Sequence, residues 1–170
     1  YSSAASDVYK RQILAVAERN GDPAAVAAKM GRPLVNTRDV TVRGGVAVIP
    51  VNGPIFRYAN LFTEISGATS LEILARDFTQ AVEDPAIKAI VLEIDSPGGQ
   101  ASGIAEFADM VRAANKPVTA YVDGIGASAA YWIAAAADSI VASKTGMVGS
   151  IGAVIGFDAR NYENYVEIVS

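Results

Sequence analysis

The chain has 170 residues, of which 51% are hydrophobic and 19% are charged, so it can form one domain with a buried core and is not a disordered chain. A net charge of −4 argues against a nucleic-acid partner. Cysteine and histidine are absent, which excludes thiol catalysis, imidazole metal sites and a Ser-His-Asp triad made within the chain. No metal or cofactor is expected.

The first 43 residues are predicted to precede the core. Residues 1–12 have no apolar centre and are typical of a non-native leader rather than a secretory signal. Residues 13–43 predict a short helical arm followed by a polar connector, because Asp22-Pro23 is a favourable helix start. The longest apolar run, Ala129 to Ala137, is too short to cross a bilayer, so no membrane segment is expected in this sequence.

From residue 44 onward, apolar runs of strand length alternate with helical patterns. Alternation of this kind requires crossover connections and therefore predicts parallel strands in an α/β domain over residues 44–170. The final segment, Tyr165–Ser170, has the pattern of a strand that is just beginning, so this domain is expected to be truncated at its C-terminus. Strands are predicted at residues 46–51, 89–94, 118–122 and 139–142, and helices at 69–83, 103–114 and 128–137.

One connection is unusually apolar. The segment from Ile55 to Ala68 contains several large hydrophobic side chains in an otherwise polar loop. A substrate-groove wall, a small satellite core and a subunit contact would each explain them, and the subunit contact is the preferred interpretation. The side chains concerned are Phe56, Tyr58, Leu61 and Phe62.

Two glycine-rich corners follow consecutive strands. In α/β folds the carboxyl ends of parallel strands meet at one edge, where free backbone N–H groups converge. The first corner is Asp95–Gly99, in which Pro97 and Gly98 let the backbone turn back and present an unpaired N–H. The candidate N–H on this corner is that of Gly99. Asp95 is expected to accept N–H groups of the turn.

The second corner holds a candidate nucleophile. It runs from Gly124 to Ala129, and Gly126 and its small neighbours leave room for a substrate beside Ser128. Ser128 is predicted to occupy the first turn of an apolar helix, where the helix dipole favours an anionic oxygen. The Ala129 N–H is the second candidate oxyanion donor. Alone, a serine at a helix start is usually a cap and Pro-Gly-Gly is usually a turn, but the two corners together favour a catalytic site.

Three motifs resemble one enzyme family: Asp-Ser-Pro-Gly-Gly at 95–99, Gly-Ala-Ser-Ala-Ala-Tyr-Trp at 126–132 and Gly-Ser-Ile-Gly at 149–152. They resemble the signal-peptide-peptidase-A serine peptidases, which include membrane-associated peptidases and phage capsid-maturation proteases. The resemblance implies a Clp protease/crotonase-like fold, a spiral of β-β-α units. It also implies a peptide or protein substrate and a homo-oligomer.

The same resemblance implies roles for individual residues. Ser128 would be the nucleophile, and the N–H groups of Gly99 and Ala129 would form the oxyanion hole. Alanine stands at 129 and 130 where the family usually has two glycines, so a slightly narrower site is expected. Ser150 would orient a catalytic lysine, although it is also explained as an ordinary turn serine.

The lysine itself is not evident in the sequence. Lys144 is an internal candidate, but it precedes the Gly-Ser-Ile-Gly motif, whereas the family's lysine follows the strand after that motif. The base is therefore expected shortly after Ser170, and the chain as it stands is expected to be inactive. Supply of the lysine by a neighbouring subunit is an alternative.

Two other function classes remain open. A crotonase-type acyl-CoA enzyme would hold a thioester enolate with the same N–H groups and would use Glu93 or Glu106 as acid or base. A non-catalytic assembly scaffold would keep only the fold. Among peptidases, the sequence favours the phage branch, in the host cytoplasm or procapsid, over a membrane-associated signal peptide peptidase.

Overall fold

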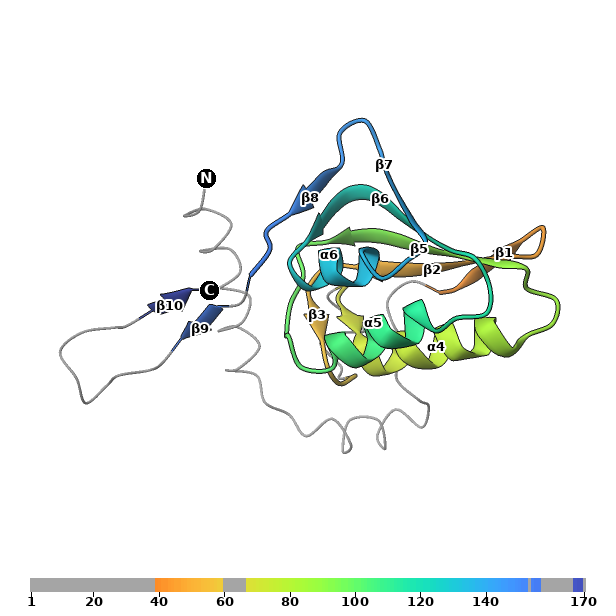
Figure 1. Ribbon diagram of the computed structural model, residues 1–170, viewed down its shortest axis with the longest axis horizontal. Helices are drawn as coiled ribbons and strands as arrows, with labels where there is room; N and C mark the ends of the chain where they lie inside the picture. Colours follow the sequence, from red (N-terminus) through yellow and green to blue (C-terminus); the bar gives the residue numbers. More distant parts are fainter. Residues whose placement is uncertain (1–38, 60–66, 153, 157–166, 170) are drawn as a thin grey trace.

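The computed structural model describes residues 39–59, 67–152, 154–156 and 167–169, and it has an α/β architecture (Figure 1). Its main sheet has the strand order β1-β2-β5-β6-β7, and β8 pairs with β6 beyond the end of β7. All pairings in this sheet are parallel except that of β1 with β2. The strands are β1 (Thr41–Arg43), β2 (Val46–Asn52), β5 (Ala89–Ser96), β6 (Val118–Ala127), β7 (Ser139–Ala142) and β8 (Met147–Gly149).

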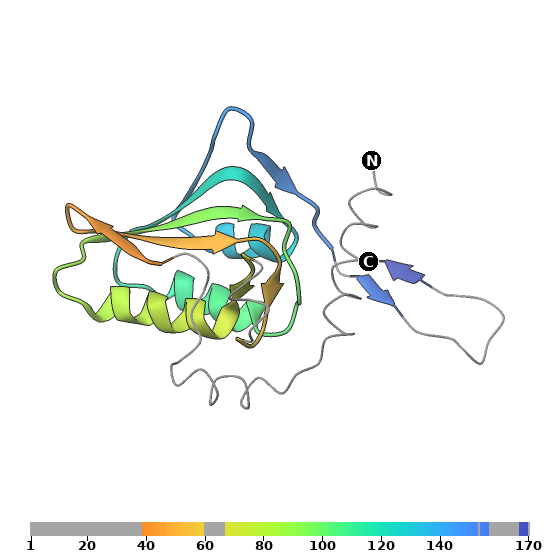
Figure 2. The same ribbon diagram turned by 180° about the vertical axis from the view of Figure 1, so that it is seen from behind.

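The central strands bury one face of the sheet. Alternate residues are buried along β2, β5 and the first half of β6, as expected when every second side chain points to the same side. Three helices lie on that side, which Figure 2 shows from behind. The buried strand residues are Ala47, Ile49, Val51, Ile90, Leu92, Ile94, Val118, Ala120 and Val122.

The helices among the described residues are α4 (Leu71–Glu83), α5 (Ile104–Arg112) and α6 (Ala129–Ala134). Phe78 of α4 and Phe107 of α5 meet edge to face, with ring centroids 5.6 Å apart. This aromatic pair fixes α4 and α5 side by side beneath the sheet. The arrangement therefore confirms the predicted α/β class with parallel pairing.

Thr69 and Glu72 have the spacing of a capping box, which indicates Thr69 as the helix cap, but α4 begins at Leu71. The cap is Ser70, whose Oγ accepts the N–H of Ile73 at 3.4 Å. Thr69 instead exchanges two hydrogen bonds with Asn52: its Oγ1 accepts the Asn52 N–H and donates to the Asn52 carbonyl. A tertiary contact thus occupies the hydroxyl that the local pattern had indicated as a cap.

Several short strands differ from the predicted elements. β1 lies in the predicted polar connector, and β8 lies in the glycine-rich stretch before Ser150. In the predicted loop after residue 54, β3 (Ile55–Phe56) pairs in parallel with β4 (Thr69–Ser70). The expected strand at 165–170 is β10 (Glu167–Val169), and it pairs antiparallel with β9 (Val154–Gly156).

The predicted N-terminal helical arm lies outside the described residues, and so do Leu61 and Phe62 of the predicted apolar loop at 55–68. The two aromatic residues of the loop that the structure does describe differ in burial: Phe56 is buried and Tyr58 is 61% exposed. Within the described ranges, no helix is long and apolar enough to span a membrane.

Candidate active site

The first corner is anchored by a buried serine. Ser96 is fully buried at the end of β5; its Oγ donates to the Gly53 carbonyl at 2.6 Å and accepts the Gly98 N–H at 3.1 Å. The carbonyl of Asp95 also accepts the N–H of Gly53 at 2.9 Å. These bonds hold the turn at exposed Pro97 against the end of β2.

Gly98 and Gly99 run alongside Ile55 of β3. The N–H of Ile55 donates to the Gly98 carbonyl, and its carbonyl accepts the N–H of Gln100, each at 2.9 Å. A Cβ at residue 99 would lie 2.0 Å from the Ile55 carbonyl oxygen, so only glycine fits this approach. In this pairing the intervening N–H of Gly99 points away from Ile55.

Gly98 brings the two corners into contact. It has φ +93°, and a Cβ there would lie 2.8 Å from the Ser128 Cβ, 2.8 Å from the Ala129 nitrogen and 2.6 Å from the Ala127 carbonyl oxygen. The first corner therefore packs directly against the peptide that follows Ser128. The juxtaposition that the sequence predicted for these two motifs is present in the structure.

Ser128 was predicted to lie in the first turn of the helix, and this prediction is wrong. Ser128 is the residue before α6, with φ 54° and ψ −122°, a backbone conformation that residues with a Cβ rarely adopt. Its carbonyl accepts the N–H of Trp132 at 3.0 Å. The Ser128 hydroxyl makes no capping hydrogen bond to α6, so it is available for another partner. A sharp strand-to-helix turn, rather than the helix dipole, positions it.

Two backbone N–H groups flank this serine. No hydrogen bond joins the N–H of Gly99 or of Ala129 to another residue in the described part of the chain. Because Gly98 lies against the Ala129 nitrogen, both N–H groups belong to the same small region. Two unpaired donors beside a hydroxyl are the components that an oxyanion-binding site requires.

Ser150 lies beside Ser128 in the strand register. β6 and β8 end on the pair Ala127–Gly149, and each serine is the next residue of its chain segment. The N–H of Ser128 donates to the Gly149 carbonyl at 3.0 Å. Both serines have positive φ, 54° for Ser128 and 52° for Ser150.

Gly126 is buried two residues before Ser128. A Cβ there would lie 3.1 Å from the nearest methyl group of Val122, so a larger residue would push against the β6 strand itself. Gly126 therefore contributes close packing beneath the serine rather than a contact to a substrate. Gly126 was predicted to belong to the loop of the site, and its contribution to that loop is one of packing.

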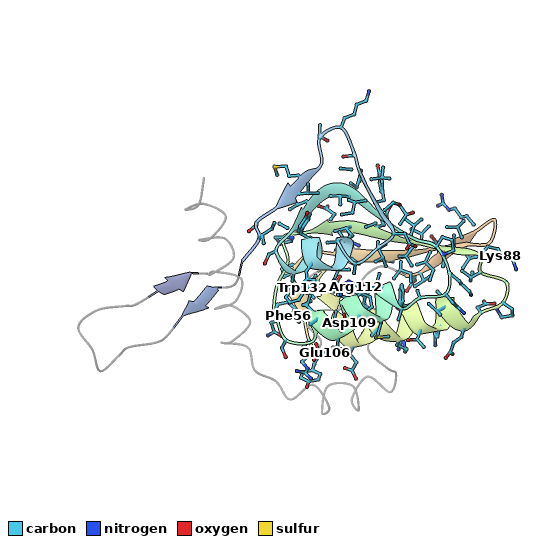
Figure 3. The ribbon with its side chains drawn as sticks, in the orientation of Figure 1. Phe56, Lys88, Glu106, Asp109, Arg112 and Trp132 are labelled. Carbon is cyan, nitrogen blue, oxygen red and sulfur yellow. The ribbon has the colours of Figure 1, made fainter. Side chains whose placement is uncertain are left out.

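The described lysines do not approach Ser128 through a hydrogen bond or ion pair. Lys116 Nζ donates to the carbonyls of Ala81 at 2.9 Å and Asp84 at 2.6 Å, at the C-terminus of α4. Lys88 lies at the end of the domain opposite Phe56 and Trp132 (Figure 3). Lys144 is exposed in the turn between β7 and β8.

Asp95 has a role that the sequence pattern did not indicate. It was expected to accept N–H groups of its own turn, but Ser96 takes the Gly98 N–H instead. The Asp95 carboxylate accepts the N–H of Ile125, on the neighbouring strand, at 3.0 Å. The available signal was the glycine at 124, which leaves room for the close approach of this carboxylate.

Comparison with known proteins points to a peptidase family. The pattern of Peptidase family S49 matches residues 110–169. The chain is 32% identical over 120 residues to capsid assembly protease C of Escherichia phage lambda, covering 69% of this chain and 27% of that protein. It is 41% identical over 113 residues to Protease 4 of Salmonella typhi, covering 64% of this chain and 18% of that protein. The chain thus spans about a quarter or less of these relatives.

Solved structures show the same fold. The 1510-N membrane-bound stomatin-specific protease aligns with a TM-score of 0.55 at 20% identity, over 75% of this chain and 56% of that one. A probable enoyl-CoA hydratase from Mycobacterium thermoresistibile aligns with a TM-score of 0.51 at 22% identity, over 65% of this chain and 51% of that one. The fold is shared by peptidases and acyl-CoA enzymes, whereas the two sequence relatives described above are both named as proteases. The chain is therefore a relative of the S49 serine peptidases, of the signal-peptide-peptidase-A type, with the Clp protease/crotonase fold.

Proposed function

We propose that the protein is a serine endopeptidase in which Ser128 is the nucleophile. The observation that carries the proposal is the contact of Gly98 with the Ser128–Ala129 peptide, which brings Ser128 together with two N–H groups that have no hydrogen-bond partner among the described residues. The substrate class is a peptide or protein, as the names of the related proteases indicate.

The proposed reaction proceeds through an acyl-enzyme. The Ser128 Oγ attacks the scissile carbonyl carbon while a base takes its proton, and the N–H groups of Gly99 and Ala129 stabilise the resulting oxyanion. Collapse of the tetrahedral intermediate breaks the C–N bond, and the protonated base gives its proton to the leaving amine. Water then attacks the acyl-enzyme by the same route and regenerates the Ser128 hydroxyl.

The base is proposed to be a lysine, as the resemblance to the signal-peptide-peptidase-A peptidases implies, and residues 1–170 contain no histidine that could act in its place. Lys116 is held at the C-terminus of α4 by two carbonyls, and Lys88 lies at the far end of the domain. Lys144 is exposed, whereas a lysine base must be buried enough to become neutral near pH 7. Lys10 and Lys29 lie outside the described residues and precede the predicted core, whereas the lysine of the resembled family follows the strand after the Gly-Ser-Ile-Gly motif. We therefore place the base beyond residue 170, with Ser150 orienting it from the end of β8.

The biological role is proposed to be maturation of a phage or prophage capsid. Support comes from the similarity to the lambda capsid assembly protease. The host cytoplasm or the procapsid would then be its location, and a homo-oligomer its working form. A membrane-associated signal peptide peptidase is the alternative, supported by the similarity to Protease 4.

The crotonase-type alternative would use the two N–H groups to hold a thioester enolate. Its candidate acids fit less well: Glu93 lies mid-strand in β5, opposite Tyr121, and Glu106 is exposed on α5. That alternative also leaves the conformation of Ser128 unexplained. A scaffold without catalysis would leave both N–H groups unused. Binding of coenzyme A would favour the crotonase alternative.

The test is cleavage of casein and of a candidate capsid scaffold by the full-length protein. Ser128→Ala should abolish cleavage, and Ser139→Ala, which changes an exposed serine of β7, should not. Cleavage that persists in Ser128→Ala would refute the proposal. Loss in both variants would also refute the specific role of Ser128.

A further inference from the structure

The register between β5 and β6 breaks just before the site. Ile94 pairs with Val122, but the next pair is Ser96 with Gly126. One residue of β5, Asp95, therefore faces three residues of β6, at 123–125, so β6 carries a bulge of two extra residues. Bulges of this kind change the direction of a strand and re-aim the side chains that follow it.

The bulge is also where β6 changes partner. Before it, residues 119–122 pair with β7; from residue 125 onward, β6 pairs with β8. Ser143 supports the change from the β7 side: its N–H donates to the Val122 carbonyl and its Oγ to the Asp123 carbonyl. Only two residues, Gly126 and Ala127, separate the bulge from Ser128.

The Asp95 carboxylate supports the bulge from the β5 side. Its Oδ1 accepts the Ile125 N–H at 3.0 Å, and a Cβ at residue 124 would lie 2.3 Å from the same oxygen. Gly124 is not among the residues with positive φ, so its backbone conformation would admit alanine. An alanine at 124 would therefore displace the carboxylate from this position rather than strain the backbone.

Asp95 is tied to both halves of the proposed site. Its carbonyl accepts the Gly53 N–H, and the next residue, Ser96, fixes the Gly98 N–H. Its side chain fixes the strand that ends at Ser128. One residue therefore links the loop carrying the Gly99 donor to the strand carrying the hydroxyl.

We infer that Asp95 is a positioning residue that sets the distance between the Ser128 hydroxyl and the oxyanion donors by clamping the β6 bulge through Ile125 and Gly124. This inference rests on the proposed peptidase function. The carboxylate acts as a hydrogen-bond acceptor, so its negative charge is not required. A neutral side chain with the same acceptor should replace it.

The experiment measures kcat and KM of the full-length protein on a fluorogenic peptide, with kcat normalised to the fraction of sites that react with a serine-directed phosphonate. Asp95→Ala should lower kcat about tenfold or more, because small displacements of catalytic groups are costly, while KM changes little. Asp95→Asn keeps an Oδ1 acceptor and should retain most of the wild-type kcat. A merely structural role would lower the melting temperature and the reactive fraction but would leave kcat per reactive site unchanged.

Gly124→Ala probes the same contact from the other strand. Its Cβ meets the carboxylate, so kcat per reactive site should fall, and combining it with Asp95→Ala should cost no more than Asp95→Ala alone. Should Asp95→Ala not fold, the Gly124→Ala and Asp95→Asn values decide alone. Wild-type kcat in Asp95→Ala or Gly124→Ala, equal impairment in Asp95→Asn and Asp95→Ala, or additive losses in the double variant would each overturn the inference.

Ser128→Ala, measured alongside, distinguishes a failure of the proposed peptidase function from a failure of the positioning role of Asp95. If it retains cleavage, the proposed function fails regardless of Asp95. If it is inactive while Asp95→Ala has the wild-type kcat, the function stands and only the positioning role of Asp95 fails.

Discussion

The backbone N–H of Ser128 donates a hydrogen bond to the carbonyl oxygen of Gly149 at 3.0 Å. This bond continues the parallel pairing of β6 with β8 by one residue and fixes the backbone of Ser128 at the point where the chain turns into α6. It also ties the Gly-Ser-Ile-Gly motif to the predicted nucleophile. Two motifs that lie apart in the sequence are thereby joined by a main-chain hydrogen bond.

The first prediction concerns the backbone strain at Ser128. At φ 54° a Cβ is unfavourable, so Ser128→Gly should be more stable than Ser128→Ala by about 1 kcal/mol, although both lack the hydroxyl and both should be inactive. Urea denaturation of the two variants measures the difference. Equal stability, or a less stable glycine variant, would show that Ser128 does not adopt this conformation.

The second prediction concerns Gly98. Its alanine variant carries the cost of a positive φ and, in addition, places a methyl group within 2.8 Å of the Ala129 nitrogen and 2.6 Å of the Ala127 carbonyl. Gly98→Ala should therefore lose about 3 kcal/mol or more of folding stability, or keep the fold with the two corners pushed apart and activity lost.

Gly44→Ala is the matched control for Gly98→Ala. Gly44 also has positive φ (+57°), but nothing lies within 4 Å of the position of its Cβ. It should lose only about 1 kcal/mol, the backbone cost alone, and should keep full activity. Similar losses in the two variants would mean that Gly98 does not pack against the Ser128–Ala129 peptide.

The third prediction concerns the buried Ser96. Ser96→Ala removes the acceptor of the Gly98 N–H and the donor to the Gly53 carbonyl, so it should cost about 2 kcal/mol in the free energy of unfolding. Thr79→Ala, which removes a hydroxyl bonded within α4, should cost less than about 1 kcal/mol. Chemical denaturation distinguishes them, and a loss for Ser96→Ala no greater than that for Thr79→Ala would contradict the buried bridge.

The fourth prediction concerns the lysines. Replacement of Lys88, Lys116 or Lys144 by methionine in the full-length protein should leave kcat near the wild-type value, because none of them is proposed as the base. Lys116→Met alone should also lose about 1 kcal/mol of stability, since its ammonium group satisfies two carbonyls at the end of α4. Loss of kcat in Lys144→Met would overturn the placement of the base beyond residue 170.

Much of the core could be predicted from the sequence because its elements are local and regular. The apolar runs at 46–51 and 89–94 became β2 and β5, and the helical pattern at 69–83 became α4, which begins at Leu71. β8 was not predicted, since Met147–Gly149 is short, bounded by glycine and exposed, so no pattern of buried residues marks it. Its existence depends on pairing with β6, which no local signal reports.

The composition of the site could also be predicted, but its geometry could not. The motifs indicated which glycines turn the chain, and Gly98 does pack against the Ser128–Ala129 peptide. The sequence pattern predicted a helix that includes Ser128, because the small apolar residues after it favour a helix. The extra residues of the β6 bulge instead continue the strand to Ala127 and force a sharp turn at Ser128. The register between neighbouring strands depends on tertiary contacts, so no local sequence pattern indicates the β6 bulge or the turn at Ser128.

The most direct test of the central claim is to treat the full-length protein with a fluorophosphonate, which reacts with activated serine hydroxyls, and to locate the adduct by peptide mass spectrometry. Our account predicts one adduct on Ser128, absent after denaturation and absent in Ser128→Ala. An adduct on Ser150 or on another serine, or no adduct on a folded protein that cleaves peptides, would contradict the assignment of Ser128 as the nucleophile.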